Sequence, residues 1–121
     1  AGDVGSQYTP TAGWAEAITY HRDVLQDPRF AGSIGVALGG DGSVATNGFW
    51  SALTMATTLK LPMLFYIEDN GLGISVGGEM QTPGSDIARN LASFGNLFIR
   101  NGDGTDPAAT AQLIGECVAH V

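Results

Sequence analysis

The sequence predicts an α/β fold in which a parallel sheet is flanked by helices. Short apolar runs at residues 33–38 and 63–68 have the length and composition of buried strands. Segments with helical spacing of apolar residues lie between and around them, and such alternation favours a parallel sheet with right-handed crossovers. Because ligands of such sheets bind beyond the carboxyl ends of the strands, the turns after these two runs are the expected place for a functional site.

The first third of the chain is expected to hold one helix and one strand. Residues 1–13 are rich in glycine, threonine and proline and predict a loop. Residues 14–25 carry small and apolar residues at helical spacing. Residues 33–38, SIGVAL, form an apolar run typical of a strand that is buried on both faces. A glycine turn at residues 39–42 follows directly and leads into the next helix.

The rest of the chain continues the alternation. Apolar residues at helical spacing predict a helix over residues 47–60, which Pro62 ends before the second strand at residues 63–68. The elements expected beyond that strand are a glycine-rich loop at residues 69–84, a helix at residues 85–94, a third strand at residues 96–100 (NLFIR), and a helix that Asp106 caps and Pro107 begins.

Composition and charge narrow the classes of function. Of the 121 residues, 44% are apolar, which allows a core, and only 14% are charged, against an average of about 25%. Such sparse charge suggests that other protein covers much of the surface, as in an oligomer. The net charge of −7, with five scattered basic residues, argues against nucleic acid as a partner. The apolar runs are also shorter than the roughly 20 residues that cross a bilayer, so no membrane partner is expected.

The chain has one cysteine, Cys117. A single thiol allows no disulfide and no cysteine-based zinc site within the chain, which fits a reducing compartment such as the cytoplasm. We expect Cys117 to be a small buried apolar residue.

Two polar side chains follow the two predicted strands. Asp41 comes directly after the first strand, within Gly-Asp-Gly, and Asn70 follows the second. Their oxygens suit Mg²⁺, which takes six oxygen ligands and usually only one or two carboxylates plus substrate phosphates. Gly42 and Ser43 stand where the next helix would begin, so their backbone N–H groups would favour a phosphate oxygen. The sequence therefore predicts a site for Mg²⁺ and a diphosphate at this edge of the sheet.

The spacing of these residues resembles a family fingerprint. Gly-Asp-Gly at residues 40–42, then the 26 residues 43–68, then a pair ending in Asn70 is the pattern of thiamin-diphosphate enzymes. The stretch FWSALTMATTLKLPMLFYIEDNGLGIS resembles the thiamin-binding, alpha-type subunit of 2-oxo acid dehydrogenases, and is most similar to forms in which the alpha and beta parts are fused. The segments VGSQYTPTAGWAEA, MQTPGSDIARNLASFG and DGTDPAAT resemble the flanking regions of that family. The resemblance implies a transketolase-like, thiamin-diphosphate-binding fold.

The resemblance also implies the residues of the site. Its metal ligands would be Asp41, the side chain of Asn70 and the backbone carbonyl of Leu72. The residues lining the diphosphate would be Gly40, Gly42, Ser43 and Gly73, and those meeting the aminopyrimidine ring would be Gly2 and the carbonyl of Val4. Asp69 departs from the pattern, because most of the family has asparagine there, and it places an extra carboxylate beside a ligand.

The activity that the resemblance implies is oxidative decarboxylation of a 2-oxo acid, with transfer of the acyl group to lipoyl. Its partners would be a beta-type subunit or domain and a lipoyl-bearing acyltransferase. The carboxylate that activates thiamin comes from the other subunit in this family. The chain's own glutamates are Glu16, Glu68, Glu79 and Glu116, and none lies in a segment that matches the activating position. We therefore expect no catalytic residue in this chain and no turnover by it alone.

Residues 1–121 are expected to form the diphosphate- and magnesium-binding part of a thiamin-diphosphate-binding domain, as a fragment of a longer chain. The chain begins without methionine, inside a segment that resembles a cofactor-binding loop, and has only about three predicted strands, where doubly wound sheets commonly have five or six. Three alternatives stay open: another thiamin-dependent activity of the transketolase kind, a non-catalytic domain with a diphosphate site, and a generic nucleotide-binding α/β domain.

Other polar and aromatic residues have simpler expected roles. Without the spacing to Asn70, Asp41 would be read as a turn residue that caps the next helix. A second Gly-Asp-Gly at residues 102–104 is followed by only 17 residues, too few for the fingerprint, and predicts an ordinary turn. We expect His21 to be solvated or capping, Glu68 to bond backbone or a neighbour, and Trp14 and Trp50 to be core or interface residues.

Overall fold

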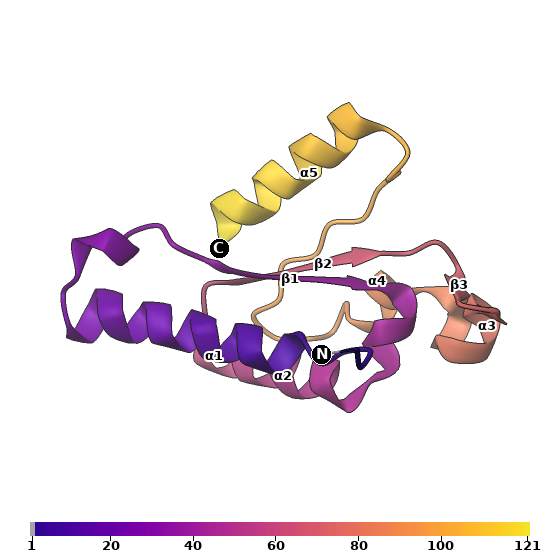
Figure 1. Ribbon diagram of the computed structural model, residues 1–121. Helices are drawn as coiled ribbons and strands as arrows, with labels where there is room; N and C mark the ends of the chain where they lie inside the picture. The colour runs from indigo at the N-terminus through magenta and orange to yellow at the C-terminus, as the bar shows by residue number, and fades with distance from the viewer. Residues whose placement is uncertain (1) are drawn as a thin grey trace.

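The computed structural model describes residues 2–121 and has a two-stranded parallel sheet at its centre. Strand β1 (Gly35–Gly40) pairs in register with β2 (Met63–Glu68), from Gly35 opposite Met63 to Gly40 opposite Glu68. Helices α1 (Tyr8–Thr19) and α2 (Asn47–Leu59) lie on one side of these strands, and α5 (Pro107–His120) lies on the other (Figure 1). The predicted α/β class is confirmed, whereas the transketolase-like arrangement stays a prediction.

Short elements connect these main parts. In chain order they are the π-helix η1 (Tyr20–Val24), the 3₁₀-helices η2 (Pro28–Phe30) and η3 (Asp41–Ala45), the antiparallel pair β3 (Leu72–Gly73) and β4 (Val76–Gly77), the one-turn helix α3 (Gly78–Gln81), the 3₁₀-helix η4 (Pro83–Ser85) and α4 (Ile87–Asn90). Most of them lie at the end of the sheet where β1 and β2 finish (Figure 1). None of the helices found over residues 2–121 is long and apolar enough to cross a membrane.

The first helix begins earlier than the sequence predicts. Residues 8–13 are helical, not loop, and the helix runs from Tyr8 into the π-helical turn η1. Pro10 lies in the first turn, where backbone N–H groups have no helical partner in any case. Tyr8, Ala12 and Ala15 are fully buried at helical spacing, so packing against the sheet outweighs the loop-like local composition.

Strand β1 is buried on one face only, so the prediction of burial on both faces is wrong for this strand. Ala37 points into the core, whereas Val36 is 46% exposed and Leu38 is 64% exposed. The covered face meets α1 closely: a Cβ atom on Gly35 would lie 3.2 Å from the carbonyl oxygen of Thr11. Glycine at this position lets the helix approach the strand.

Helix α2 and strand β2 form as predicted and carry the core. Thr46 caps α2 by accepting a hydrogen bond from the N–H of Phe49, and Lys60 ends the helix in the left-handed conformation. The ring of Phe49 packs edge-on against Tyr8, with centroids 5.2 Å apart, and against Phe65, with centroids 5.7 Å apart. This aromatic group joins α1, α2 and β2 directly behind the turn that follows β1.

The C-terminal part agrees with the prediction only for its last helix. Residues 96–100 form no strand, because nothing in residues 2–121 pairs with their backbone, although Leu97 and Ile99 pack on the core. The helix expected over residues 85–94 is reduced to α4, four residues long. Helix α5 is confirmed, with the Asp106 carboxylate accepting hydrogen bonds from the first free N–H groups.

The two tryptophans and the cysteine are less buried than core residues. Trp14 is 71% exposed and Trp50 is also exposed, so neither is a core residue in residues 2–121, and the interface role stays a prediction. Cys117 is half-buried rather than buried, and burial raises the pKa of its thiol above the ordinary value.

Candidate functional site

The two main strands end side by side, which brings the predicted site segments to one edge of the sheet. Gly40 is the last residue of β1 and lies opposite Glu68, the last residue of β2. Asp41 and Asp69 are therefore the first residues beyond the same edge of the ladder. This register confirms the prediction that the turns after β1 and β2 lie close together.

Asp41 is a buried carboxylate. It begins η3 directly after β1, and only 4% of its surface is exposed. Its Oδ2 accepts a hydrogen bond of 2.8 Å from Nε2 of Gln81, the last residue of α3. None of the ion pairs found among residues 2–121 includes Asp41. A buried carboxylate that has a neutral partner and no cation is a strong potential ligand for a metal ion.

Two glycines face each other beside Asp41. A Cβ atom on Gly42 would lie 3.6 Å from the Cα of Gly73 and 3.2 Å from Oε1 of Gln81. A Cβ atom on Gly73 would collide with the same Oε1. The turn after β1 and the strand β3 thus approach each other with no side chains between them except the carboxamide of Gln81. Bare backbone on two sides of a carboxylate is the arrangement expected of a phosphate cradle.

Ser43 is held beneath this turn by two hydrogen bonds. Its hydroxyl donates to the carbonyl oxygen of Gly40 at 2.5 Å, so the Tyr8 hydroxyl, also 2.5 Å away, is the donor to Ser43 Oγ. Burial raises the pKa of Tyr8 above its ordinary value, against a smaller lowering by this hydrogen bond. A Cβ atom on Gly39 would overlap the Tyr8 hydroxyl, so glycine is required where the ring passes under the strand end.

Asp69, Asn70 and Leu72 shape the turn that follows β2. The Oδ1 atom of Asp69 accepts from the N–H of Gly71 at 2.9 Å, and Oδ1 of Asn70 accepts from the N–H of Leu72 at 3.0 Å. Both are Asx turns, and Gly71 adopts a positive φ of 73° between them. The Asn70 side chain is exposed, with its oxygen engaged by the backbone, so it would have to share or release that contact to ligate a metal ion.

The N-terminal segment lies against the same end of the molecule. Gly5 is buried at φ 83°, and a Cβ atom there would collide with the side chain of Thr46, which caps α2. This contact places the upstream segment beside η3. Gly2 and Val4 are both exposed, and nothing lies within 4 Å of a Cβ built on Gly2. Any role for these two residues therefore requires a ligand that reaches over from the turn.

Sequence reasoning missed two residues of this site, Gln81 and Tyr8. Gln81 reaches Asp41 across 40 residues of sequence and Tyr8 reaches Ser43 across 35. Neither belongs to a local pattern. The sequence does carry one signal for Tyr8, which is an aromatic residue at helical spacing from Ala12 and Ala15.

Other candidate features of the chain lie outside the site. The second Gly-Asp-Gly is an ordinary turn as predicted, since Oδ1 of Asp103 accepts from the backbone N–H and the hydroxyl of Thr105. A cavity of about 850 Å³ lies between α2, β2 and the C-terminal segment, and none of the predicted site residues lines it. Within residues 2–121 there is also no group of three or more His, Cys, Asp or Glu that could hold a metal ion, so a metal at Asp41 needs amide, carbonyl or ligand oxygens.

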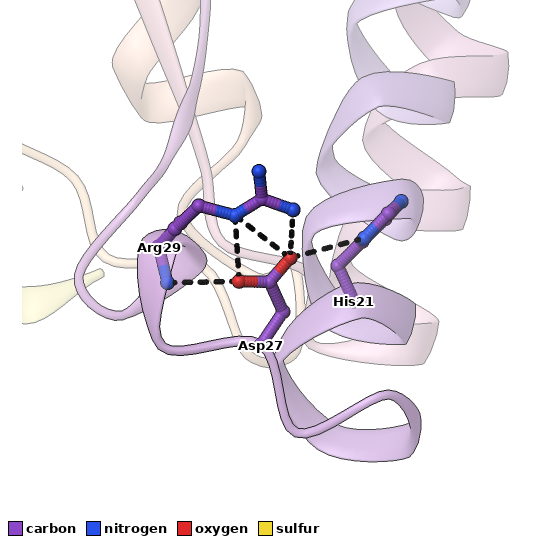
Figure 2. A network of polar contacts seen from close by, with 3 residues as sticks. All are labelled: His21, Asp27 and Arg29. Atoms are coloured by element: carbon purple, nitrogen blue, oxygen red, sulfur yellow. Dashed lines mark hydrogen bonds and ion pairs between the residues drawn. The ribbon is translucent and has the colours of Figure 1, made fainter.

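His21 belongs to a separate polar group in η1 and η2, the short helices between α1 and β1, which lie at the end of the sheet opposite the ends of β1 and β2 (Figure 1). Asp27 lies between His21 and Arg29 (Figure 2): Arg29 pairs with the carboxylate at 2.6 Å, and Nδ1 of His21 is 3.9 Å from it. The imidazole also stacks on Phe30, with centroids 4.4 Å apart. This group stabilises the connection between α1 and β1 and contributes nothing to the turn at Asp41.

Comparison with known proteins gives the family. Residues 1–120 match the family described as "Dehydrogenase E1 component". Similar proteins are the pyruvate dehydrogenase E1 component subunit alpha of Bacillus subtilis (28% identical, over 90% of this chain and 28% of that protein) and of Staphylococcus aureus (28% identical, over 93% and 28%). The 3-methyl-2-oxobutanoate dehydrogenase subunit alpha of Mycobacterium tuberculosis is 32% identical over 72% of this chain and 23% of that protein. The chain spans about a quarter of the length of these relatives, and it belongs to the dehydrogenase E1 component family as an alpha-type domain of the 2-oxo acid dehydrogenases.

Proposed function

We propose that the edge of the sheet at Asp41 binds thiamin diphosphate through Mg²⁺. The observation that carries this proposal is the buried Asp41 carboxylate next to the facing glycines Gly42 and Gly73. The carboxylate is the one charged ligand of the set, and the amide oxygen of Asn70 and the carbonyl of Leu72 are the neutral ligands. One carboxylate with neutral oxygens fits Mg²⁺, because the diphosphate supplies the remaining negative charge.

The residues around the turn fit a diphosphate for two reasons, and the upstream segment fits the rest of the cofactor. Gly40, Gly42 and Gly73 leave the backbone open to close approach. Ser43 is fixed by Tyr8 and by the Gly40 carbonyl, so the backbone of η3 is rigid before any ligand arrives. The exposed Gly2 and Val4, on the segment that Gly5 anchors to Thr46, would meet the part of the cofactor beyond the diphosphate.

The proposed activity is oxidative decarboxylation of a 2-oxo acid, with acyl transfer to lipoyl on an acyltransferase. When bound, thiamin diphosphate supplies the carbanion chemistry. The chain's own residues hold and orient the diphosphate end. Two of its glutamates have other roles within the chain: Glu68 ends β2 opposite Gly40, at the diphosphate end of the site, and Glu116 is held by Arg100. We propose that a beta-type subunit or domain contributes the activating carboxylate, within an oligomer. The single thiol Cys117 supports a reducing, cytoplasmic setting.

The proposal is tested by whether thiamin diphosphate and Mg²⁺ raise the midpoint of thermal unfolding. Thermal unfolding is measured with thiamin diphosphate plus Mg²⁺, with thiamin diphosphate plus a chelator, and with ADP plus Mg²⁺. The proposal expects the midpoint to rise only in the first condition. An equal rise of the midpoint with ADP would favour a generic nucleotide-binding domain. A rise without Mg²⁺ would show that Asp41 does not hold the diphosphate through a metal ion.

The activity has its own test. Decarboxylation of pyruvate and of branched 2-oxo acids is assayed with an artificial electron acceptor, for this chain alone and after adding the beta-type partner. The proposal expects turnover only with the partner. Turnover by the chain alone, at a rate near that of the complete assembly, would contradict it.

A further inference from the structure

The contact between Gln81 and Asp41 has a consequence for ligand entry. The two ends of one carboxamide occupy two different places: Nε2 donates to the Asp41 carboxylate at 2.8 Å, and Oε1 lies between Gly42 and Gly73. A hydrogen-bond donor thus lies where a cation would bind the carboxylate. An acceptor lies in the glycine-lined space, where a phosphate oxygen would lie. A single neutral side chain reproduces the charge pattern of a cation with an anion beside it.

We propose that Gln81 is a placeholder in this site, which satisfies Asp41 in the absence of ligand and must withdraw before Mg²⁺ and a diphosphate can bind. This inference rests on the proposed function. Its physical basis is that a buried carboxylate without a partner is costly, so the empty site needs a donor to Asp41. A glutamine can fill this role because its hydrogen bond to Asp41 is weaker than the contact of a carboxylate with a divalent cation, so Mg²⁺ can displace it.

The segment that carries Gln81 is built to move. Helix α3 has a single turn and no buried residue; it begins at the glycine pair Gly77–Gly78 and is followed by Gly84, which has a φ of 63°. One backbone hydrogen bond, from the N–H of Gly78 to the carbonyl of Gly71, ties it to the turn after β2. Ile74, between β3 and β4, and Met80, on α3 itself, are largely exposed. With so few apolar contacts, displacement of α3 costs little free energy.

The placeholder role predicts an unusual sign for a substitution in a binding site. Gln81→Ala removes the competing donor, so Mg²⁺-dependent binding of thiamin diphosphate should become tighter, by about tenfold, which is the order expected when one hydrogen bond to a charged group no longer has to be broken. The ligand-free protein should unfold at a lower temperature than wild type, because Asp41 loses its partner. The liganded protein should unfold within a degree or two of wild type.

The experiment is a calorimetric titration of the protein at its natural length, assembled with its partner subunit, using thiamin diphosphate at fixed Mg²⁺. Gln81→Met serves as a second variant that keeps the side-chain volume and removes both polar ends; it should also bind more tightly than wild type, by less than Gln81→Ala. Gln112→Ala is the matched control, because Gln112 is an exposed glutamine on α5 that donates a hydrogen bond to Glu116, away from Asp41. This control should bind as wild type does.

The outcomes separate the two claims. Tighter binding by Gln81→Ala and Gln81→Met, with lower stability of the ligand-free forms, supports the placeholder. Wild-type binding with equal or weaker binding by both variants overturns it and leaves the proposed function intact. Absence of Mg²⁺-dependent binding in wild type and in both variants would overturn the proposed function and, with it, the role of Gln81.

Discussion

The hydroxyl of Tyr8 donates to the Oγ of Ser43 at 2.5 Å, across 35 residues of sequence. This contact joins the first turn of α1 to the turn that follows β1. Because Ser43 in turn donates to the Gly40 carbonyl, the chain of hydrogen bonds fixes the backbone on both sides of Asp41. The candidate site is therefore supported by the first turn of α1, which lies in residues that local sequence patterns predict as loop.

Tyr8→Phe tests that support. The substitution keeps the ring that packs on Phe49 and removes the buried hydrogen bond, so the free energy of unfolding should fall by about 1 kcal/mol. Chemical denaturation followed by far-ultraviolet circular dichroism measures the change. Tyr20→Phe is the control, because Tyr20 is exposed and should change stability by less than about 0.5 kcal/mol. Equal effects of the two substitutions would contradict the role of the Tyr8 hydroxyl.

The pH dependence of stability tests the group in Figure 2. Hydrogen bonds from Arg29 lower the pKa of the Asp27 carboxyl from 3.8 to about 2. Because the folded-state pKa is lowered, the ionised carboxylate stabilises the fold above about pH 4, and this contribution is lost as the pH falls towards 2. Asp27→Asn should flatten the fall of unfolding free energy over that range. An NMR titration that placed the Asp27 midpoint near 4 would contradict this account.

Removal of the cap of α5 tests the last predicted element. The Asp106 carboxylate accepts from the N–H groups of Ala108 and Ala109, so Asp106→Ala should destabilise this helix by about 1 kcal/mol. Because no residue of α5 is buried, the loss should appear as faster amide hydrogen exchange within α5 and little change in β1 and β2. Uniformly faster exchange across the chain would show that α5 unfolds only with the rest.

The sequence predicts the parts of this fold that are locally encoded. Strands β1 and β2 and helix α2 have their own apolar patterns, Pro62 follows the end of α2, and Asp106 caps α5 by local geometry. The positions of Asp41 and Asn70 follow from the parallel register, because two strands joined by one helix end at the same edge.

The failures have non-local causes. The residues before Trp14 are helical because Tyr8 and Ala12 pack against the sheet, a tertiary effect that outweighs loop-like composition. Leu97 and Ile99 have a strand-like pattern but find no strand to pair with in residues 2–121, so their apolar side chains pack on the core without a ladder. The contact of Gln81 with Asp41 depends on how a glycine-rich loop folds back, which no periodicity encodes.

The most direct measurement of the central claim is Mg²⁺-dependent binding of thiamin diphosphate by wild type, Asp41→Ala, Asn70→Ala and Asp103→Ala, followed by calorimetry. Asp103 is the matched control, because it is the aspartate of the second Gly-Asp-Gly and only shapes its own turn. The account predicts a loss of at least about a hundredfold in affinity for Asp41→Ala, since loss of even an outer-shell partner of a metal typically costs 10–100-fold. It predicts a milder loss for Asn70→Ala and none for Asp103→Ala, with the folds retained. Binding by Asp41→Ala as tight as wild type, with the Mg²⁺ dependence intact, would contradict it.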